Sequence, residues 1–562
     1  MKSSRSTLTF TLIVIVGFLT VAPVLMLAFG SFSEGLSAFG RFTFAKYVAA
    51  YTDPALLGVI VNTVVFVLGS TIVATGLALF LAYLNTRTDI PFKFLFGVLA
   101  IVPMMIPHLL FSVSWGLLLN PSNGLINSAL QQAFSLQDAP FDIYTLHGMI
   151  LVEGLLNMPI AYLIIPPAMA SFDVSLEESS RVFGAGTWRT LLRVTLPVLR
   201  PAILAAFVLG VVRSLASYAV PRVLGTPGRV EVLATYLYEM IATGYSPDYG
   251  KAAALGMSAL AASIVLIWVY RLLTAESGKF VTISSRGYRP TVIELKRMRM
   301  PLFIAVALLS FVVIVLPVAV LLYTSFVPYS MVPGPEAFAQ MSWRHWTEVI
   351  EDPTSLLALR NSLLLGVVGA TLGVLLSLFV AYVIVKVRTR ASGLLESLTY
   401  LSFSFPGIVI GVGFMWFFVQ TPLYATLGAL LIGYIATYLP YGVRPLASAF
   451  VQVHAHLEES SLVCGAGPMT TMRRIIVPLL IPGVVSAWIL MATMFLRELT
   501  VSIVLSRPGS EVLAVQILGF ADDGLWGKLS ALGIIMIVIS TALVLLANFA
   551  GARFKAAQGS AG

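Results

Sequence analysis

Two stretches that combine glutamate, glycine and proline at one spacing are the residues of this sequence best suited to carry a function. The glutamate precedes the first glycine by six positions, and that glycine precedes the proline by thirteen. The residue types favour recognition by charge and shape rather than the making or breaking of bonds. The three residues are Glu178, Gly184 and Pro197 in the first stretch and Glu459, Gly465 and Pro478 in the second.

Each stretch is predicted to form a short helix, a tight turn and the start of another helix. Ser175 and Glu178 form an S-x-x-E pattern, which predicts a capping box at the helix start. In the second stretch His456 replaces Ser175, so we expect a weaker start. Glycines permit the turn that ends the helix. The turn residues are Gly184, Ala185 and Gly186 in the first stretch and Gly465, Ala466 and Gly467 in the second.

Other chemistry finds little support in the sequence. The string from Gly244 to Lys251 has the wrong spacing for a phosphate-binding loop, and Ala252 stands where a hydroxyl is needed. No histidine or cysteine cluster has metal-ligand spacing. Cys464 is the single cysteine and is predicted to be a small buried hydrophobe, because Phe183 occupies the equivalent position. We therefore predict no catalytic residue, no metal and no cofactor bound by this chain.

Composition places these stretches in a membrane protein. Of 562 residues, 58% are hydrophobic and 10% are charged, whereas soluble domains carry about 25% charged residues. The mean hydropathy is +0.95. Such composition argues against a soluble enzyme and a disordered chain. The net charge of +9 is explained by basic loops on the cytoplasmic side of a membrane rather than by nucleic-acid binding.

Twelve stretches are apolar over about 20 residues, the length that a membrane-spanning helix needs. Residues 94–180 contain no Lys or Arg, so the loop at 120–144 is predicted to face outward and both termini to be cytoplasmic. The predicted spans lie near 8–30, 57–84, 95–119, 145–170, 200–220, 252–273, 301–326, 361–385, 396–420, 424–446, 482–506 and 529–551.

The chain is internally duplicated. The segment L-E-E-S-S at 176–180 reappears at 457–461, an offset of 281, and Asn62 matches Asn361 at an offset of 299. The repeats predict two parallel six-helix units related by a pseudo-two-fold axis along the membrane normal, with a passage between them. The predicted division is a first unit at 1–273, a basic cytoplasmic linker at 274–300 and a second unit at 301–562.

Four polar residues at predicted membrane depth are candidates for the translocation path: Arg213, Ser217, Arg497 and Glu498. Charges within a span are costly and often functional. They could line the passage, with Arg213 pairing with Glu498 or acting in gating. Two structural interpretations remain open, namely side chains that extend toward the outer headgroups and an ion pair between the units. Glu153 and the pair Asn62 and Asn361 are predicted to stabilise helix packing.

At the two glutamate–glycine stretches the sequence resembles the permease subunits of binding-protein-dependent ABC importers, which carry an E-A-A-x3-G-x9-I-x-L-P loop in the same place. Here Ser-Ser replaces Ala-Ala in both stretches, and Val477 replaces the leucine before the second proline. Two units in one chain are similar to the fused ferric-ion and thiamine permeases. The segment R-E-L-T at 497–500, followed by Arg507-Pro508, is most similar to the ferric-ion branch.

The resemblance implies an all-helical, type I importer fold in the inner membrane and alternating access driven from outside the chain. It places each stretch as a coupling helix that docks on one of two cytoplasmic ABC ATPase copies, which bind the ATP and Mg²⁺. It also implies an extracytoplasmic solute-binding protein. Ferric ion is the first expectation for the cargo, with thiamine, a polyamine or a phosphonate as alternatives. Two other function classes stay open, namely a secondary transporter driven by an ion gradient and a non-transporting membrane scaffold or enzyme.

Overall fold

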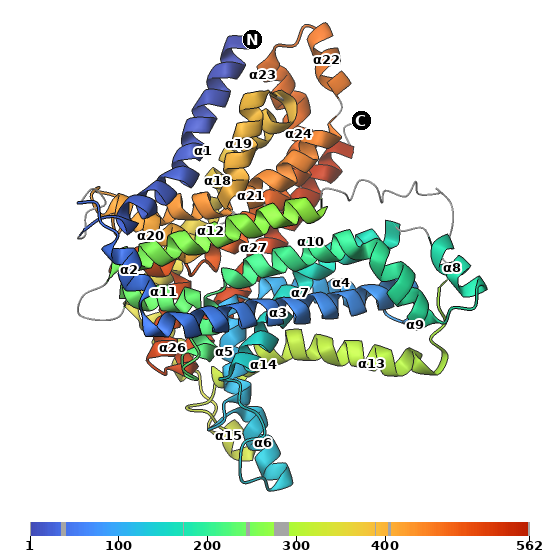
Figure 1. Ribbon diagram of the computed structural model, residues 1–562, viewed down its shortest axis with the longest axis vertical. Helices are drawn as coiled ribbons and strands as arrows, with labels where there is room; N and C mark the ends of the chain where they lie inside the picture. The colour runs from blue at the N-terminus through green and yellow to red at the C-terminus, as the bar shows by residue number, and fades with distance from the viewer. Residues whose placement is uncertain are drawn as a thin grey trace. The chain divides into compact units, whose positions relative to one another are not determined.

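The computed structural model is built from helices (Figure 1). It describes residues 2–34, 41–171, 174–242, 248–274, 292–387, 389–402, 406–453 and 455–559. Within these ranges the extended pairings are two isolated bridges, Ser33 with Phe42 and Thr88 with Ile293. These elements confirm the all-helical prediction for the described residues. The physical reason is that a backbone crossing hydrocarbon must satisfy its hydrogen bonds internally, as a helix does.

The helices of the first sequence repeat include several long ones connected by short ones. Their bounds are α1 Lys2–Ser31, α2 Ala45–Tyr51, α3 Pro54–Arg87, α4 Phe94–Ile101, α5 His108–Leu119, α6 Leu125–Phe134, α7 Leu146–Ser171, α8 Ser175–Val182, α9 Thr187–Thr190, α10 Leu196–Leu215, α11 Leu233–Ala242 and α12 Tyr249–Thr274.

The second repeat follows the same order. Its helices are α13 Arg299–Ser310, α14 Leu316–Thr324, α15 Pro335–Ala339, α16 Arg344–Glu351, α17 Pro353–Leu364, α18 Ala370–Tyr382, α19 Arg390–Leu401, α20 Gly407–Phe418, α21 Leu427–Gln452, α22 Ala455–Val463, α23 Pro468–Thr471, α24 Val477–Leu496, α25 Ser502–Leu505, α26 Leu513–Asp522 and α27 Trp526–Gly559.

Among the described residues, nine helices are long and apolar enough to cross a membrane. They contain α1, α3, α7, α10, α12, α13–α14, α17–α18, α24 and α27, and each overlaps a predicted span. The overlap is partial for α24, which ends at Leu496 whereas the predicted span runs to 506. The predicted span near 95–119 is instead a pair, α4 and α5, bent by 101°. The span near 396–420 is divided between α19 and α20. The span near 424–446 is the continuous helix α21, whose tyrosines and prolines lower its hydropathy.

By its contacts the chain forms two compact units that draw helices from both repeats. One unit comprises 1–52, 237–258 and 344–562, and the other comprises 53–236 and 259–343. Helix α1 therefore packs on α19 and α20 of the second repeat, whereas α13 and α14 pack on α4 and α5 of the first. The sequence division at 273 and 301 stays a prediction, and most of the predicted linker, 275–291, lies outside the described residues.

Small residues allow the long helices to approach closely. A Cβ added to Gly154 of α7 would lie 2.6 Å from the side chain of Val73 on α3. In the equivalent helix pair of the second repeat, a Cβ on Gly442 of α21 would collide with Ser377 of α18. Close approach through small residues is the usual basis of helix packing in membranes, where burial of apolar surface supplies no net force.

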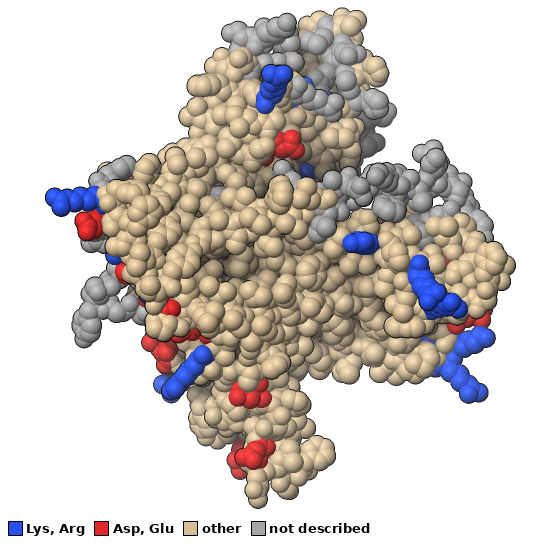
Figure 2. Space-filling view, in the orientation of Figure 1, with Lys and Arg blue, Asp and Glu red and all other residues tan. Residues whose placement is uncertain are grey.

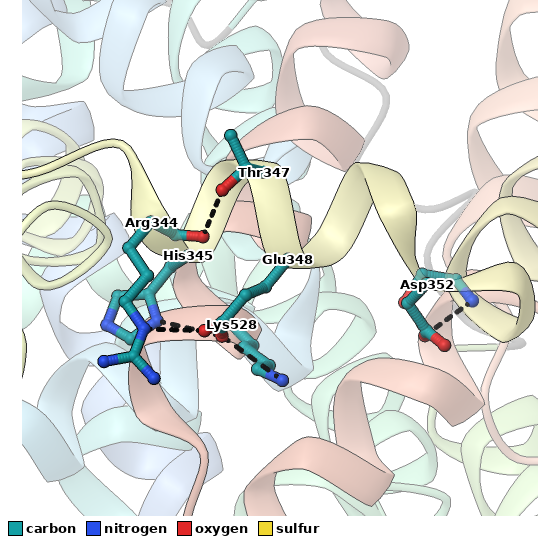
Figure 3. A network of polar contacts seen from close by, with 7 residues as sticks. Arg344, His345, Thr347, Glu348, Asp352 and Lys528 are labelled. Atoms are coloured by element: carbon teal, nitrogen blue, oxygen red, sulfur yellow. Dashed lines mark hydrogen bonds and ion pairs between the residues drawn. The ribbon is translucent and has the colours of Figure 1, made fainter.

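The short amphipathic helix α16 is attached to the start of α27 by a network of charges (Figure 3). Glu348 accepts a hydrogen bond of 2.7 Å from Nε of Arg344 and lies 3.3 Å from Nζ of Lys528. Asp352 caps α17 through the backbone N–H groups of Thr354 and Ser355. This network attaches α16, which also packs on α17, to α27.

Candidate functional site

The two predicted coupling loops have the same architecture in the structure. In the first, α8 and α9 are followed by a π-helical turn and then by α10, and in the second α22 and α23 lead through a π-helical turn into α24. From the starts of α9 and α23 to the ends of α10 and α24, the element bounds repeat at the offset of 281. The π-helical turns are Leu191–Thr195 and Met472–Ile476.

Each proline of the pattern lies at the second residue of the long helix that follows. Pro197 occupies this place in α10, and Pro478 occupies it in α24. A proline has no N–H to donate to the carbonyl four residues earlier, and the wider π-helical turn that precedes it accommodates this loss. Each loop thus continues into its long helix without a flexible joint.

The predicted capping box at the first loop is wrong. Helix α8 does begin at Ser175, but the cap position is held by Val174, and no side chain caps it. Ser175 therefore lies inside the helix rather than before it. Two acids, Glu177 and Glu178, stand in the first turn, where they are stabilised by the helix dipole. In the second loop the residue before α22, 454, lies outside the described residues, so its start stays a prediction.

The predicted glycine turn is confirmed in both loops. Gly184 has φ +81° and Gly465 has φ +80°, the left-handed conformation that ends many helices. The N–H of Ala185 donates to the carbonyl of Ser180 at 3.1 Å, and that of Ala466 donates to the carbonyl of Ser461 at 3.0 Å. Gly186, by contrast, has φ −66° and is extended.

A pair of hydroxyls closes each loop. The side chains of Ser180 and Thr190 share a hydrogen bond of 3.0 Å, and those of Ser461 and Thr471 share one of 2.8 Å. These serines are the second of each Ser-Ser pair, at which the sequence departs from the Ala-Ala of the resembled family. The departure thus has a structural role, and the threonine ten residues later in both repeats is the sequence signal that could have revealed it.

The acid that holds the first loop to the membrane helices is Glu177 rather than Glu178. Glu177 is buried, lies 3.3 Å from Nε of Arg87 at the end of α3, and accepts a 2.8 Å hydrogen bond from Thr195. Glu178 is half-buried. In the second loop Glu459 lies on α22, but its side chain is outside the described residues. The predicted docking role of Glu178 and Glu459 stays a prediction.

Both loops present apolar side chains outward. Val182 is 85% exposed and Phe183 is 90% exposed at the end of α8, and Val463 is 88% exposed at the end of α22. Cys464 is also exposed, so the prediction that it is buried is wrong. Cys464 directly follows the end of α22, where the turn directs its side chain away from the protein. Exposed apolar patches of this kind mark interaction surfaces.

Of the candidate path residues, Arg213 and Ser217 belong to a buried polar cluster between α7 and the end of α10. Ser217 donates to Glu153 at 2.7 Å, Asn157 donates to Glu153 at 2.8 Å, and Nε of Arg213 lies 3.4 Å from Oδ1 of Asn157. Ser214 accepts a 3.1 Å hydrogen bond from Asn157. Glu153 is thus a buried acid with several partners, in agreement with its predicted role in packing.

Glu498 occupies a break after α24. Its carboxylate accepts hydrogen bonds from the N–H of Thr500 at 3.1 Å and from the N–H of Val501 at 2.7 Å, so it satisfies backbone groups that the break leaves without helical partners. Arg497 donates to the sulfur of Met494. Arg213 and Glu498 lie in different compact units, so their pairing and their place in a passage stay predictions.

The predicted packing role of the repeated asparagines also has a structural basis. Asn62 donates to the carbonyl of Glu231 at 3.2 Å, and Asn361 donates to the carbonyl of Glu511 at 2.9 Å. Each therefore holds the segment that leads into α11 or α26 against the second long helix of its repeat.

Comparison with known proteins gives the family. The model of the family described as "binding-protein-dependent transport system inner membrane component" matches residues 74–279 and again residues 373–556. The chain is 28% identical over 551 residues to the ferric transport system permease protein FbpB of Actinobacillus pleuropneumoniae, covering 95% of this chain and 76% of that protein. It is 28% identical over 502 residues to the putative ferric transport system permease protein FbpB 1 of Haemophilus influenzae, covering 87% and 75%.

A shorter alignment is 28% identical over 207 residues to the spermidine/putrescine transport system permease protein PotC of Haemophilus influenzae. It covers 37% of this chain and 80% of that protein. A crystal structure of a bacterial ABC transporter that imports alginate aligns with 46% of this chain and 88% of its own, at 20% identity and a TM-score of 0.35. The family matches fall on both sequence repeats and together cover more than half of the chain. The protein therefore belongs to the inner-membrane components of binding-protein-dependent transport systems, as a multi-pass permease with two such units in tandem.

Proposed function

We propose that this chain is a membrane permease subunit of an ATP-driven importer, operated through its two coupling loops. The observation that carries the proposal is the repetition of one loop geometry at an offset of 281, from the left-handed glycine to the π-helical turn. Two equivalent docking elements suit a symmetric pair of ATPase subunits. No single-site partner would need both.

Each loop suits docking on a separate cytoplasmic ATPase. The exposed Val182, Phe183 and Val463 supply apolar contact, and the half-buried Glu178 in the first turn of α8 supplies charge. Because α9 and the π-helical turn run directly into α10, movement of the loop displaces a membrane helix as a rigid body. ATP and Mg²⁺ are assigned to the ATPase, and no cofactor is assigned to this chain.

The mechanism is alternating access. Closure of the ATP-bound ATPase pair moves both loops and opens the passage outward, a solute-binding protein releases its cargo, and hydrolysis restores the inward state. This proposal places both termini and both loops on the cytoplasmic side. Arg213, Ser217, Arg497 and Glu498 are retained as candidate residues of the passage.

Ferric ion is the proposed cargo. It is supported by two relatives that carry ferric transport in their names and align over most of this chain. The shorter similarity to a spermidine/putrescine permease favours a polyamine as the second candidate. Thiamine and a phosphonate have no comparable support.

Reconstitution tests the proposal. The full chain would be placed in proteoliposomes with candidate ATPase subunits and binding proteins, and uptake of radioactive iron would be measured with and without ATP. We expect uptake that needs ATP and the binding protein, together with stimulated ATP hydrolysis. Uptake driven by an ion gradient without ATP would instead identify a secondary transporter, and ATP-dependent uptake of a polyamine but not iron would overturn the cargo alone.

A further inference from the structure

An arginine stands in an otherwise apolar groove on the outer surface of α17. The groove has a volume of about 410 Å³, and six of its seven lining residues are leucine or valine. The seventh is Arg360. The exposed members include Leu356, Leu364 and Val368, at 46%, 40% and 50% exposure.

The groove lies on the more exposed face of α17, and all of its lining residues belong to α17 and to the π-helical turn Leu365–Gly369 that follows it. The opposite face is packed, since Ala358, Ser362 and Leu365 are at most 4% exposed. The span that begins with α17 is long and apolar enough to cross a membrane, so the surroundings of its open face are the acyl chains of the bilayer. Within the described residues the Arg360 side chain forms no hydrogen bond or ion pair.

A guanidinium in these surroundings requires an anion. Arg360 lies seven residues after Pro353, about 10 Å along the helix axis, in a hydrocarbon layer about 30 Å thick. Helical side chains incline toward the helix N-terminus, which here is the near membrane surface. The anion within reach of that end of the helix is the phosphate of a phospholipid, and guanidinium groups bind phosphate in a bidentate way.

The first repeat shows that the helix itself does not need this charge. At the offset of 299, Arg360 corresponds to Val61, which is 52% exposed on α3. The neighbouring Leu57 and Val64 are also exposed, so the same face of α3 is an apolar stripe without a cation. The arginine is therefore an addition to one repeat only.

We propose that the groove on α17 binds one anionic phospholipid, with its phosphate on Arg360 and an acyl chain along the leucine–valine stripe. The deep end of the stripe offers a reporter. The indole N–H of Trp488 donates to Thr371 at 3.0 Å, and Thr371 lies eleven residues after Arg360, about 16 Å along the helix. An acyl chain in the groove therefore reaches the neighbourhood of Trp488.

The test measures quenching of Trp488 by bromine on lipid acyl chains. The full chain is placed in phosphatidylcholine nanodiscs that contain increasing amounts of brominated phosphatidylglycerol or brominated phosphatidylcholine. The fluorescence of Trp488→Phe is subtracted to isolate the reporter. A basic residue near the membrane surface contributes about 1 kcal/mol toward anionic lipid. We therefore expect half-maximal quenching at an about five-fold lower mole fraction of the anionic lipid.

The variants define the site. Arg360→Leu should abolish the preference for phosphatidylglycerol, and Arg360→Lys should keep part of it. Arg390→Leu is the matched control, because Arg390 is exposed at the start of α19 and lies outside the groove. Equal quenching by the two lipids in the unmodified chain would overturn the proposal, as would a preference that survives in Arg360→Leu. Displacement by millimolar inorganic phosphate would also overturn it, by showing a site for a soluble anion.

Discussion

Replacing Gly184 or Gly465 by alanine tests the turn that ends each coupling helix. Both glycines have φ near +80°, and a Cβ added at either would meet no atom within 4 Å. The substitution therefore causes no collision, and its whole cost is conformational. Holding an L-residue in the left-handed region costs about 1–2 kcal/mol, so the population of the native turn relative to alternatives should fall about 5- to 30-fold.

The assay compares ATP hydrolysis stimulated by the binding protein with transport in proteoliposomes, using complexes that contain each variant. We expect the apparent affinity for the ATPase to fall by this factor for either single variant. The two costs should add in the double variant, because the loops are independent sites. The thermal midpoint of the membrane domain should change little, since the added methyl group meets no neighbouring atom. Gly184→Asn should retain more activity, because asparagine tolerates this conformation.

Gly186→Ala and Gly467→Ala are the matched controls. Neither glycine has a positive φ, and neither position has an atom within 4 Å of an added Cβ. Alanine should be tolerated at both. If Gly186→Ala impairs coupling as strongly as Gly184→Ala, or if Gly184→Ala leaves coupling intact, the conformational explanation of the turn is refuted.

Three further perturbations follow from the contacts. Arg87→Leu leaves the buried carboxylate of Glu177 without its cation, so thermal unfolding should show a loss of about 3–5 kcal/mol, and an unchanged midpoint would contradict the anchoring role. Ser461→Ala removes the hydroxyl pair of the second loop and should cost about 1 kcal/mol, seen as faster proteolysis of that loop. The hydrogen bond from Arg344 lowers the pKa of Glu348 below its ordinary 4.5. The attachment of α16 is therefore complete above that value and weakens as the pH falls below it, which hydrogen exchange of α16 can measure against Glu348→Gln.

Hydropathy and repetition predicted most of the fold because both are properties of the sequence itself. A lipid-embedded helix must be apolar over its length, so α3, α7 and α27 are visible without any knowledge of their neighbours. The bend between α4 and α5 is not visible in this way, because the bent pair is as apolar as a straight span. The exchange of α1 and α13 between compact units depends on tertiary contacts, which a linear pattern does not record.

The coupling loops show the same limit at the level of single residues. The left-handed glycines were predictable, because a backbone conformation that only glycine adopts easily leaves a trace in the sequence. Glu177 and Glu178 are adjacent and chemically identical, and only the position of Arg87 makes one of them the buried anchor. The capping box failed for a related reason, since the S-x-x-E pattern is compatible with a helix that begins at the serine as well as one residue after it.

The interface between the two long helices that flank each coupling loop carries one buried acid in each repeat, although its position differs. In the first repeat the acid is Glu153 on α7, and its hydroxyl partner is Ser217 after α10. At the offset of 281 these positions hold Tyr434 and Glu498, so the acid has moved to the other side of the interface. Tyr434 Oη lies 2.5 Å from Oγ of Ser502, which donates to the backbone carbonyl of Glu498.

The exchange of positions argues that each repeat requires polar attachment at this interface rather than a particular residue at a particular place. The attachment lies at the end of the helix pair that is remote from the coupling loop. At the loop end, Glu177 accepts from Thr195 just before α10 and pairs with Arg87, which donates to the carbonyl of Met169 on α7. A helix pair fixed at both ends moves as one body when its loop is pushed. Fixed at the loop alone, the two helices could separate and the displacement would be lost before it reached the passage. In the proposed coupling mechanism, the buried acids therefore belong to the same moving element as the loops, in spite of their distance from them along the chain.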